Sequence, residues 1–490
     1  MKYRIGIDLG TTNIKAVLYD EDLKRVSMAS AELRVIQERK GYAEQHPVEV
    51  LEAFYKVMEE VLIPIAGREK EVQLLSFSSA MHALILLGSD NALLTRSIIW
   101  SDNRATDEVE AFRESRDWLK HYRNTGTPIH PMSPFFKLLW LGKHTDLMGK
   151  TVKIMGIKEY ILMHLTKEHV MDYSMASATG ILNIHTLTWD EEALSYAGIS
   201  ESLLPRLHDV TDKLPVKNMD FLKKLGFSKD LEIMLGASDG CLSNLGSQAL
   251  RKGETTVTIG TSGAVRMTVD TPVLDDYGRT FCYYLMKGKW VIGGAVNNGG
   301  NIVDWLGGVI HEEKEDIYED LETSLSMIAR GSDGLLFLPY LYGERAPHWD
   351  GSLNASFVGL CAFHGREHLL RSVVEGMVFN LREVWEMLTA LSGESRSLTA
   401  SGGFLKSGVW AGILSDVFGR DLELADDTDA SCLGAVLLDS VPHLPKAKSR
   451  REIIRCIHGH HEEYEVHYRK YLWYSKKLIA LQKEERELFP

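Results

Sequence analysis

The chain has 490 residues, of which 44% are hydrophobic and 25% charged, and its formal net charge at pH 7 is −13. This composition is typical of globular domains with apolar cores, and the length predicts roughly two to four of them. The negative charge argues against a broad nucleic-acid-binding surface, although a few lysines and arginines can still build a local site for a small anion.

The cysteines and the N-terminus predict a cytoplasmic location. Five cysteines are scattered along the chain, and none is in C-x-x-C spacing, which is typical of reduced thiols. The N-terminus lacks the charged and apolar regions of a signal peptide. No apolar run approaches the ~20 residues that span a bilayer. We therefore expect no membrane partner and no nucleic-acid partner.

Two similar hairpins are predicted half a chain apart. Residues 3–9 are extended and apolar, a Gly-Thr-Thr-Asn turn follows, and residues 14–20 form a second apolar run. Residues 256–270 repeat this pattern around a Gly-Thr-Ser-Gly turn at 260–263. A single repeat with so long a period indicates duplication of a domain and not a solenoid.

The remaining pattern predicts an α/β protein, because extended apolar runs alternate with helical spacing. The strands that we expect cover 72–80, 83–90 and 397–404, the last running into a glycine turn, and the helices cover 46–62, 366–391, 407–419 and 464–489. The boundary falls near 245–254, where no low-complexity linker occurs. We expect domains at 1–248, with the first turn, and at 249–490, with the second turn and the terminal helix.

The residues of the first turn suit phosphate binding. Gly10 allows a close turn, Thr11 and Thr12 offer hydroxyls, and successive backbone N–H groups form an anion-binding nest. Lys15 can offset phosphate charge, and Asp8, at the end of the first strand, would hold Mg²⁺ directly or through water. The alternative is two ordinary hairpins, since a lone glycine turn is more often only a turn; the duplication weakens that alternative.

The paired turns resemble the actin-like ATPase superfamily of sugar kinases, heat-shock ATPases and actin. Two longer segments, 132–144 (MSPFFKLLWLGKH) and 356–375 (SFVGLCAFHGREHLLRSVVE), match both signature patterns of the FGGY carbohydrate kinases. The resemblance covers nearly the whole chain. It implies two duplicated actin-like (ribonuclease H-like) ATPase domains flanking a deep cleft, with ATP and Mg²⁺ as cofactors and a small polyol acid or sugar as substrate.

The resemblance assigns roles to single residues. Asp239, in LGASDGCLSNLG, is the expected general base, because the attacking hydroxyl must lose its proton to a nearby carboxylate; taken alone, the same residue could simply form an Asx turn. The residues expected at the nucleotide are Gly10, Thr11, Thr12, Lys15, Gly260, Thr261, Gly300, Asp304, Gly402, Gly403 and Ser407. The glycines of 401–404 could also be a helix-start turn without a ligand, and Ser407 stands where some relatives carry an amide.

The acceptor site is assigned in the same way. Segments 125–134 and 338–350 resemble the gluconokinase branch of the family, whereas Met81-His82 is shared with xylulokinases. The expected polyol-binding residues are Met81, His82, Trp100, Asp102, Arg104 and Asn298. Arg104 could hold a substrate carboxylate, or it could form a structural ion pair with Asp102. Arg345 could order its loop, and His130 could be a packing residue.

The activity that the resemblance implies is ATP-dependent phosphorylation of D-gluconate to 6-phospho-D-gluconate. The alternatives are xylulokinase or another pentulose or polyol kinase of the family and, less favoured, an actin-like ATPase that is not a kinase. A homodimer is the assembly left open. The histidine-rich segment 458–467 suggests a metal site but lacks zinc-module spacing, so we interpret it as a solvated entrance to the terminal helix.

Overall fold

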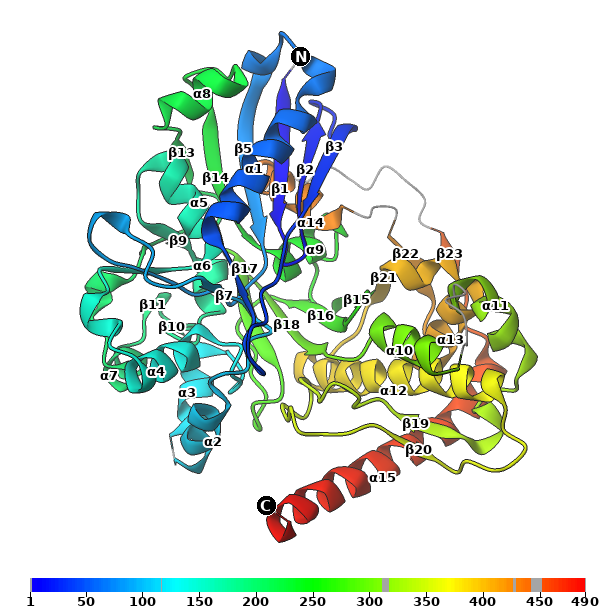
Figure 1. Cartoon of the computed structure of the whole chain (residues 1–490). Helices are drawn as coiled ribbons and strands as arrows, with labels where there is room; N and C mark the ends of the chain where they lie inside the picture. Colours follow the sequence, from blue (N-terminus) through cyan, green and yellow to red (C-terminus); the bar gives the residue numbers. More distant parts are fainter. Residues whose placement is uncertain (1, 116, 311–316, 426–428, 442–451, 490) are drawn as a thin grey trace. The chain divides into compact units, whose positions relative to one another are not determined.

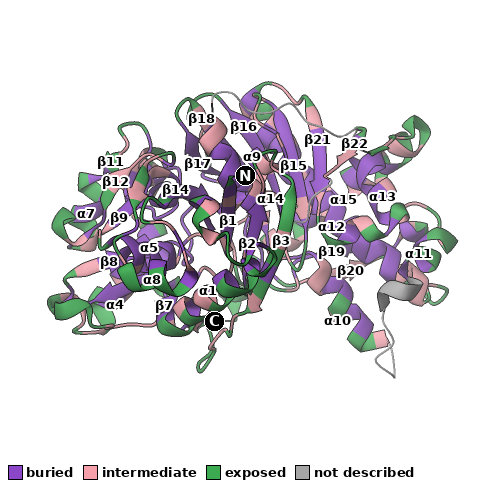
Figure 2. Cartoon of the chain, turned by 90° about the horizontal axis from the view of Figure 1, so that it is seen from above, coloured by how far each residue is buried: buried purple, intermediate pink, exposed green. Residues whose placement is uncertain are grey.

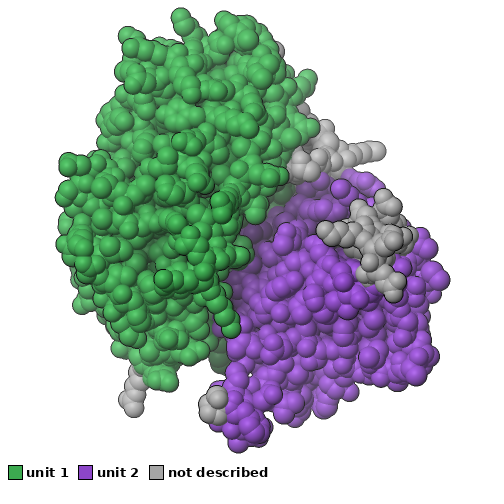
Figure 3. Space-filling model, in the orientation of Figure 1, with its two compact units in different colours: residues 1–250, 269–291, 429–448 green, residues 251–268, 292–428, 449–490 purple. Residues whose placement is uncertain are grey.

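The structure of the chain, a computed structural model, describes residues 2–115, 117–310, 317–425, 429–441 and 452–489. Its backbone contacts divide it into two compact units (Figure 3). Unit 1 comprises residues 1–250, 269–291 and 429–448, and unit 2 comprises residues 251–268, 292–428 and 449–490. The chain first passes from unit 1 to unit 2 between residues 250 and 251, two residues after the expected boundary at 248/249. Two later segments, 269–291 and 429–448, belong to unit 1 again.

Unit 1 is built on a six-stranded sheet with the order β13-β14-β5-β1-β2-β3. In that order the strands are Lys213–Pro215, Glu232–Ser238, Val72–Ser79, Tyr3–Leu9, Asn13–Tyr19 and Arg25–Glu32. Strand β1 is antiparallel to β2 and parallel to β5, and β14 is parallel to β5. The predicted N-terminal hairpin is therefore confirmed, with Asp8 opposite Lys15 across it.

The two faces of this sheet carry different helices, as the alternation of side chains along β1 requires. Ile5 and Ile7 enter a core with helices α1 (Pro47–Val61), α5 (Ile157–Thr166) and α8 (Met219–Leu225). Gly6 faces the opposite way, toward α14 (Ala430–Leu437), which Figure 1 shows in orange beside the blue β1. A Cβ at Gly6 would lie 2.2 Å from the carbonyl oxygen of Cys432, so only glycine permits this approach. Helix α9 (Asp239–Gly246) packs against α14.

A second core of unit 1 lies around short helices and strands that are inserted between β5 and β14. Its helices are α2 (Thr106–Glu114), α3 (Trp118–Thr125), α4 (Pro134–His144), α6 (Tyr173–Ser177) and α7 (Glu191–Ala197). The short strands of unit 1 are β4 (Glu44–Gln45), β6 (Ile85–Leu87), β7 (Ser97–Ile98), β8 (Lys153–Met155), β9 (Val170–Asp172), β10 (Leu182–Asn183), β11 (Thr188–Trp189), β12 (Arg206–His208) and β17 (Phe281–Met286). The strand expected at 83–90 is shorter, because a 3-10 turn with Asp90 at positive φ follows β6.

The second large sheet has seven strands, with β17 at one edge, and its other six strands repeat the first sheet in the order β23-β22-β21-β15-β16-β18. These strands are Ile453–Ile454, Leu422–Leu424, Ser397–Ser401, Glu254–Ile259, Gly263–Val269 and Lys289–Val296. Strand β15 is antiparallel to β16 and parallel to β21, as β1 is to β2 and β5. The central strands of both sheets are buried (Figure 2). The predicted duplication is confirmed by this common order and direction.

The helices of unit 2 include two that agree with the predicted ranges 366–391 and 407–419, two that were not predicted, and a C-terminal helix that starts earlier than expected. They are α10 (Gly300–Ile310), α11 (Ile317–Met327), α12 (Arg366–Ser392), α13 (Gly408–Phe418) and α15 (His458–Leu488), and a further strand pair is β19 (Leu336–Leu338) with β20 (Ser356–Val358). Helix α15 begins six residues before the predicted start at 464. The histidine-rich segment is thus helical, and its interpretation as an entrance to the helix is wrong.

Candidate active site

The second glycine turn is held against the start of α10 by backbone contacts within unit 2. Gly260 N donates to Ser262 O (2.9 Å), which closes the turn, and Gly300 N donates to Gly260 O (2.7 Å). A Cβ at Gly299 would lie 2.7 Å from the carbonyl carbon of Ser262. Glycine at 299 therefore lets the two chain segments touch, and the turn and the helix start form one rigid unit.

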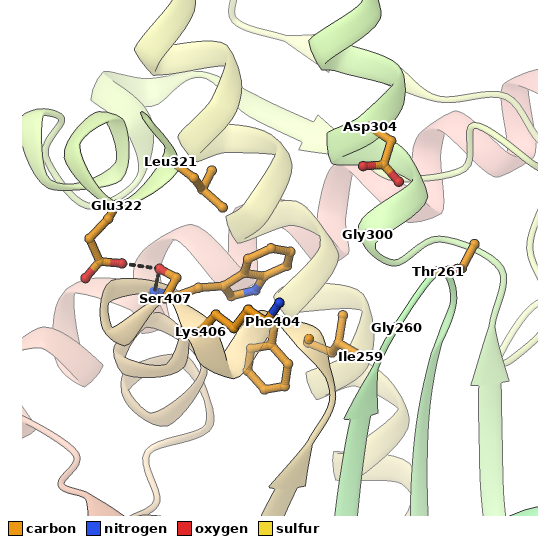
Figure 4. Close-up of a pocket in the computed structure, with 12 residues that line it drawn as sticks. Ile259, Gly260, Thr261, Gly300, Asp304, Leu321, Glu322, Phe404, Lys406 and Ser407 are labelled. Atoms are coloured by element: carbon orange, nitrogen blue, oxygen red, sulfur yellow. Dashed lines mark hydrogen bonds between the residues drawn. The ribbon is translucent and has the colours of Figure 1, made fainter. Parts of the chain in front are cut away.

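A cavity of about 490 Å³ opens beside this turn (Figure 4). Its walls come from β15, α10, α11, the Gly403–Lys406 turn and α13. The lining residues are Ile259, Gly260, Thr261, Gly300, Asp304, Leu321, Glu322, Gly403, Phe404, Lys406, Ser407 and Trp410. Six of the residues expected at the nucleotide, Gly260, Thr261, Gly300, Asp304, Gly403 and Ser407, are thus brought together around one cavity. Its volume suits a small organic ligand.

Gly402 is the predicted nucleotide residue of unit 2 that does not line the cavity. Its φ is +120°, and a Cβ there would lie 2.1 Å from the carbonyl oxygen of Ile259. The residue therefore needs to be glycine for backbone reasons. It lets the turn after β21 pass close to β15, and it places its neighbour Gly403 at the cavity wall.

A carboxylate that the sequence did not single out occupies the start of α13. Glu322 accepts a hydrogen bond from the Ser407 hydroxyl and one from Val409 N (3.1 Å). The Ser407 oxygen in turn accepts from Trp410 N (3.1 Å), which is an N-cap. Figure 4 shows Glu322 and Ser407 pointing toward one another. The expected role of Ser407 at the adenine thus competes with these two hydrogen bonds. The N–H groups of Val409 and Trp410 at the helix start, which could otherwise favour an anion, are already hydrogen-bonded.

The first glycine turn belongs to unit 1 and is braced by its own neighbours. The Thr11 hydroxyl accepts from Trp100 Nε1 (2.9 Å), and Thr11 O accepts from Gln45 Nε2 (2.7 Å). Gly10 and Thr12 complete the turn between β1 and β2. Two predicted groups, a nucleotide residue and the polyol-site residue Trp100, are therefore in direct contact here.

Asp8 and Lys15 flank this turn, and each has a partner that the sequence did not indicate. Lys15 Nζ forms an ion pair with Asp429 Oδ1 (2.7 Å), a residue that lies 414 positions away and has a fully buried side chain. Asp8 Oδ1 accepts from the Ser78 hydroxyl (2.6 Å). Burial raises the pKa of Asp8, although the Ser78 hydrogen bond and the charge of Lys15 oppose that shift. A cation near Asp8 would therefore favour its ionised form.

His82 is buried and has a left-handed backbone, with φ 71°. Its Nδ1 lies 2.7 Å from Ala178 O, and because a carbonyl only accepts, Nδ1 carries the proton. In a neutral ring with this tautomer, Nε2 is the acceptor nitrogen. The neighbouring Met81 packs against the second core of unit 1.

Asp102 and Arg104 form an ion pair with several contacts. Arg104 donates to Asp102 through Nε (2.9 Å) and Nη2 (2.8 Å), and to Glu44 Oε1 (2.5 Å). Its guanidinium also lies 4.0 Å from the centre of the Tyr42 ring. Asp102 accepts in addition from Ala43 N (2.7 Å). These contacts agree with the structural ion pair that the sequence left open, and they leave Arg104 poorly placed to bind a substrate carboxylate as well.

Lys137 is a buried lysine in the first signature segment for which the sequence suggested no role. Its ammonium donates to three backbone carbonyls, those of His82 (2.6 Å), Ile98 (3.1 Å) and Ile99 (2.8 Å). Burial lowers its pKa to about 7. One side chain on α4 therefore ties the His82 turn to the segment that carries Trp100.

Asp239 is the first residue of α9, directly after β14. Its Oδ1 accepts from the N–H of the next residue, Gly240 (2.6 Å), whereas an Asx turn would use the N–H two residues on. Ser238, immediately before it, is buried and hydrogen-bonded to Ser174. The strand end and the helix start thus fix the backbone at Asp239, and a helix N-terminus favours the negative carboxylate.

Asn298 belongs to unit 2, where a buried carboxylate holds it. Its amide donates to Glu344 Oε2 (3.0 Å) and Gly343 O (2.8 Å). Glu344 also accepts from Asn297 N (2.6 Å), Arg345 N (2.9 Å) and Asn380 Nδ2 (2.7 Å). Burial raises the pKa of Glu344 to about 7. Glu344 thus joins the 340–350 loop, α12 and the residues just before Gly299.

Arg345 and His130 have structural partners. Arg345 is buried and donates to Asn297 Oδ1 (2.7 Å) and Val296 O (3.0 Å), as expected if it orders its loop. His130 is also buried, and its Nδ1 accepts from Met132 N (3.2 Å). Both belong to segments 125–134 and 338–350, which are mostly buried. The resemblance in these segments therefore concerns residues that support the site.

Within the described ranges, the structure contains neither a metal-binding cluster nor a membrane-spanning helix. No three His, Cys, Asp or Glu side chains there are grouped so that they could hold a metal ion. In the histidine-rich part of α15, His460 and His461 instead contact the side chain and the carbonyl of Asp416. Likewise, none of the described helices has the length and apolar character needed to cross a membrane.

Comparison with known proteins decides the family. Residues 3–246 match the N-terminal domain of the FGGY family of carbohydrate kinases, and residues 255–442 match the C-terminal domain of that family. The chain belongs to the FGGY family of carbohydrate kinases. This FGGY kinase is therefore a phosphotransferase with the two-domain, actin-like fold that the resemblance implied, and ATP is the phosphoryl donor of the family.

Similar proteins include kinases with different acceptors. A gluconokinase of Bacillus subtilis (strain 168) is 40% identical over 446 residues, which cover 89% of this FGGY kinase and 86% of the relative. A xylulose kinase of the same organism is 28% identical over 441 residues, covering 89% and 88%. Two solved structures from Lactobacillus acidophilus, one titled a gluconate kinase and one a ligand-bound xylulose kinase, each show 36% identity and a TM-score of 0.93. Both matches cover 99% of this chain. They cover 99% of the gluconate kinase chain and 100% of the xylulose kinase chain.

We predict that Gly260→Val raises the KM for ATP by at least about tenfold without unfolding the protein. No atom lies within 4 Å of a Cβ at Gly260, so the Cβ of the new side chain fits without a clash. Because Gly260 lines the cavity, the added side chain occupies space there. Steady-state kinetics with varied ATP, together with the melting temperature, test this. Gly308→Val in α10, where a Cβ also meets nothing, is the control and should keep the KM. An unchanged KM in Gly260→Val would contradict the role of the turn.

We also predict that Glu344 gives the stability a pH dependence that Glu344→Gln removes. The raised pKa of Glu344, about 7 against an ordinary 4.5, means that the folded protein keeps a proton that the unfolded chain loses. The free energy of unfolding should therefore fall as pH rises from 4.5 to 7, by up to about 3 kcal/mol from this group.

Urea unfolding at several pH values measures this slope. Glu344→Gln should be less stable overall, because its amide N–H faces donors, but its slope between pH 4.5 and 7 should be smaller than that of the wild type. The exposed Glu52→Gln serves as a control that retains the wild-type slope. Equal slopes in wild type and Glu344→Gln would show that Glu344 does not titrate in this range.

Proposed function

We propose that this FGGY kinase transfers the γ-phosphoryl group of ATP to the terminal hydroxyl of D-gluconate, giving 6-phospho-D-gluconate and ADP. The observation that carries the proposal is the difference in identity between the two Bacillus subtilis relatives, 40% for the gluconokinase against 28% for the xylulose kinase. The proposal is also supported by segments 125–134 and 338–350, which resemble the gluconokinase branch. These segments would act by positioning the residues around them. A homodimer is the assembly that we propose, because α15 leaves four large apolar side chains 57–64% exposed, those of Val466, Trp473, Leu481 and Leu488.

On the donor side, each glycine turn would bind phosphate oxygens of ATP with its own backbone N–H groups. The cavity beside Gly260 and Gly300 would take the nucleoside, with backbone N–H groups and Thr261 near the phosphates. Asp304 is a carboxylate at the wall, suited to ribose hydroxyls. Beside the first turn, Lys15 would be a cation for phosphate that Asp429 holds in one orientation.

Asp8 fits a Mg²⁺ ion. It ends β1 beside the first turn, and its raised pKa shows a carboxylate whose charge is poorly solvated and would be stabilised by a cation. Mg²⁺ bound there, directly or through water, would neutralise phosphate charge. The cytoplasmic location stays a prediction from the cysteines and the N-terminal sequence.

On the acceptor side, Asp239 would accept the proton of the attacking hydroxyl as its oxygen bonds to the γ-phosphorus and the bond to ADP breaks. The end of β14 and the start of α9 hold its backbone, so the carboxylate needs little reorganisation. Nδ1 of His82 donates a hydrogen bond to Ala178 O. Nε2 of the same ring would therefore accept a hydrogen bond from a substrate hydroxyl. Lys137 would hold His82 and Trp100 in fixed positions, because it donates to the backbone carbonyls of His82 and Ile99.

The second candidate function is phosphorylation of a pentulose such as xylulose. It is favoured by the ligand-bound xylulose kinase structure, which is as similar to this chain as the gluconate kinase structure is. The residues Met81 and His82 suit either acceptor, because both substrates present rows of hydroxyl groups.

Replacing Asp239 tests the mechanism directly. Asp239→Asn should lower kcat by roughly a thousandfold or more, since the general base is lost, while the Kd of ADP stays within about twofold. Coupled ADP-release kinetics with gluconate and nucleotide titration calorimetry measure the two quantities. Asp230→Asn, at an exposed loop position, is the matched control. Full turnover in Asp239→Asn would remove Asp239 from the mechanism.

A further inference from the structure

Strand β14 is irregular just before Asp239, the residue that follows its end. In the parallel pairing of β14 with β5, the register shifts between Met234 and Ala237. Over this stretch two residues of β14, Leu235 and Gly236, lie opposite a single residue of β5, which is the pattern of a β-bulge. A bulge bends its strand and changes the direction in which the following side chains point.

One glycine and one buried lysine hold the bulge. Gly236 has a φ of +71°, and a Cβ there would lie 1.7 Å from Phe77 O, so only glycine permits this conformation. The carbonyl of Leu235, which lies within the register shift, accepts a hydrogen bond from Lys158 Nζ (3.2 Å). Lys158 is the second residue of α5, so this contact ties the start of that helix to the bulge.

A buried carboxylate holds Lys158 in turn. The ammonium group forms an ion pair with Asp172 Oδ2 (2.5 Å), and neither side chain is exposed. Asp172 Oδ1 also accepts from Met175 N (3.0 Å) and is thereby the N-cap of α6. The neighbouring carboxyl group of Glu159 is buried as well, and burial raises its pKa to about 7. The ion pair therefore links the bulge to the start of α6.

Helix α6 contacts the end of β14 at a second point. The Ser174 hydroxyl accepts from Ser238 N (3.1 Å) and donates to Ser238 Oγ (3.1 Å). Both serines are buried, and Ser238 directly precedes Asp239. The backbone that leads to Asp239 is thus held at the bulge by Lys158 and at its last strand residue by Ser174.

We propose that Lys158 and Ser174 are positioning residues for the carboxylate of Asp239. The inference rests on the proposed role of Asp239 as the general base. A displacement of about 1 Å in a reacting group can cost roughly a hundredfold in rate, so a base on a bulged strand end needs support. This role also explains the buried ion pair with Asp172, since apolar side chains would avoid the cost of removing two charges from water.

Ser174→Ala tests the inference through the separate responses of kcat and KM. We expect kcat to fall by at least about tenfold, while the KM for ATP stays within about twofold because both glycine turns are unchanged. ADP release would be measured with whichever of D-gluconate and D-xylulose turns over faster, so that the result does not depend on the acceptor. A wild-type kcat in Ser174→Ala would overturn the inference.

Thr166→Val is the matched control for this variant. It also removes a buried hydroxyl of unit 1, one that donates to Leu162 O (2.8 Å) near the end of α5. Its melting temperature should fall as that of Ser174→Ala does, but its kcat should stay within about twofold of the wild type. An equal loss of kcat in both variants would show that any lost buried hydrogen bond has this effect, and it would overturn the positioning role.

A double-mutant cycle separates positioning from a general loss of structure. In an Asp239→Asn background, Ser174→Ala should change the residual kcat by less than about twofold, because the base that it positions is already absent. The same fold loss in both backgrounds would show that Ser174 does not act through Asp239. Full turnover in Asp239→Asn alone would remove the base and this inference with it. A large loss there, with none in Ser174→Ala, would overturn only the inference.

Replacing both members of the ion pair tests Lys158. Lys158→Met combined with Asp172→Asn removes the two charges and keeps an N-cap, since asparagine is also a good cap. This variant should melt at a higher temperature than Lys158→Met alone, which leaves a buried carboxylate without its cation. Its kcat should nevertheless be at least about tenfold below the wild type, because Leu235 O has lost its donor. A wild-type kcat in the double variant would overturn the role of Lys158.

Discussion

The cavity of unit 2 depends on one contact between two stretches of backbone, where Gly300 N donates to Gly260 O. The contact requires glycine at 299, since any Cβ there would overlap the Ser262 backbone. It joins the turn after β15 to the start of α10, and both then line the same cavity. The positions of Thr261 and Asp304 follow from this junction, because each lies within a few residues of it.

Buried polar side chains hold the loops around both glycine turns. In unit 2, Glu344 collects hydrogen bonds from Asn297, Asn298 and Asn380, and so it anchors the chain immediately before Gly299. In unit 1, Lys137 fixes the backbone at His82 and before Trp100. A buried charge is costly unless it is fully hydrogen-bonded. Both groups meet that condition, and we infer that they are retained for positioning.

Local patterns predicted much of the fold. The two hairpins, the long helix α12 and the helix after β21 follow from strand alternation, helical periodicity and glycine turns, which act over a few residues. The start of α15 was misplaced, because the histidines of 458–467 have no apolar periodicity and are held in the helix by contacts with Asp416. That partner lies more than 40 residues away in the sequence.

The partners of the site residues could not be predicted for the same reason. Six expected nucleotide residues do line one cavity, since the glycine-turn pattern is local. The ion pair of Lys15 with Asp429, the hydrogen bond of Ser407 to Glu322 and the carbonyl contacts of Lys137 all join distant segments. No pattern in a single sequence reports such pairings. They nevertheless decide which charges are available to a ligand, as Arg104 illustrates.

The central claim is that D-gluconate is the phosphoryl acceptor, and a substrate panel tests this claim most directly. ADP release would be measured with ATP and, in turn, D-gluconate, D-xylulose, D-ribulose and glycerol, and kcat/KM compared. The account predicts the highest kcat/KM for gluconate, by at least about a hundredfold over each of the other three, which corresponds to roughly 2.7 kcal/mol in transition-state binding. A higher kcat/KM for xylulose, or ATP turnover that is indifferent to all four compounds, would contradict it.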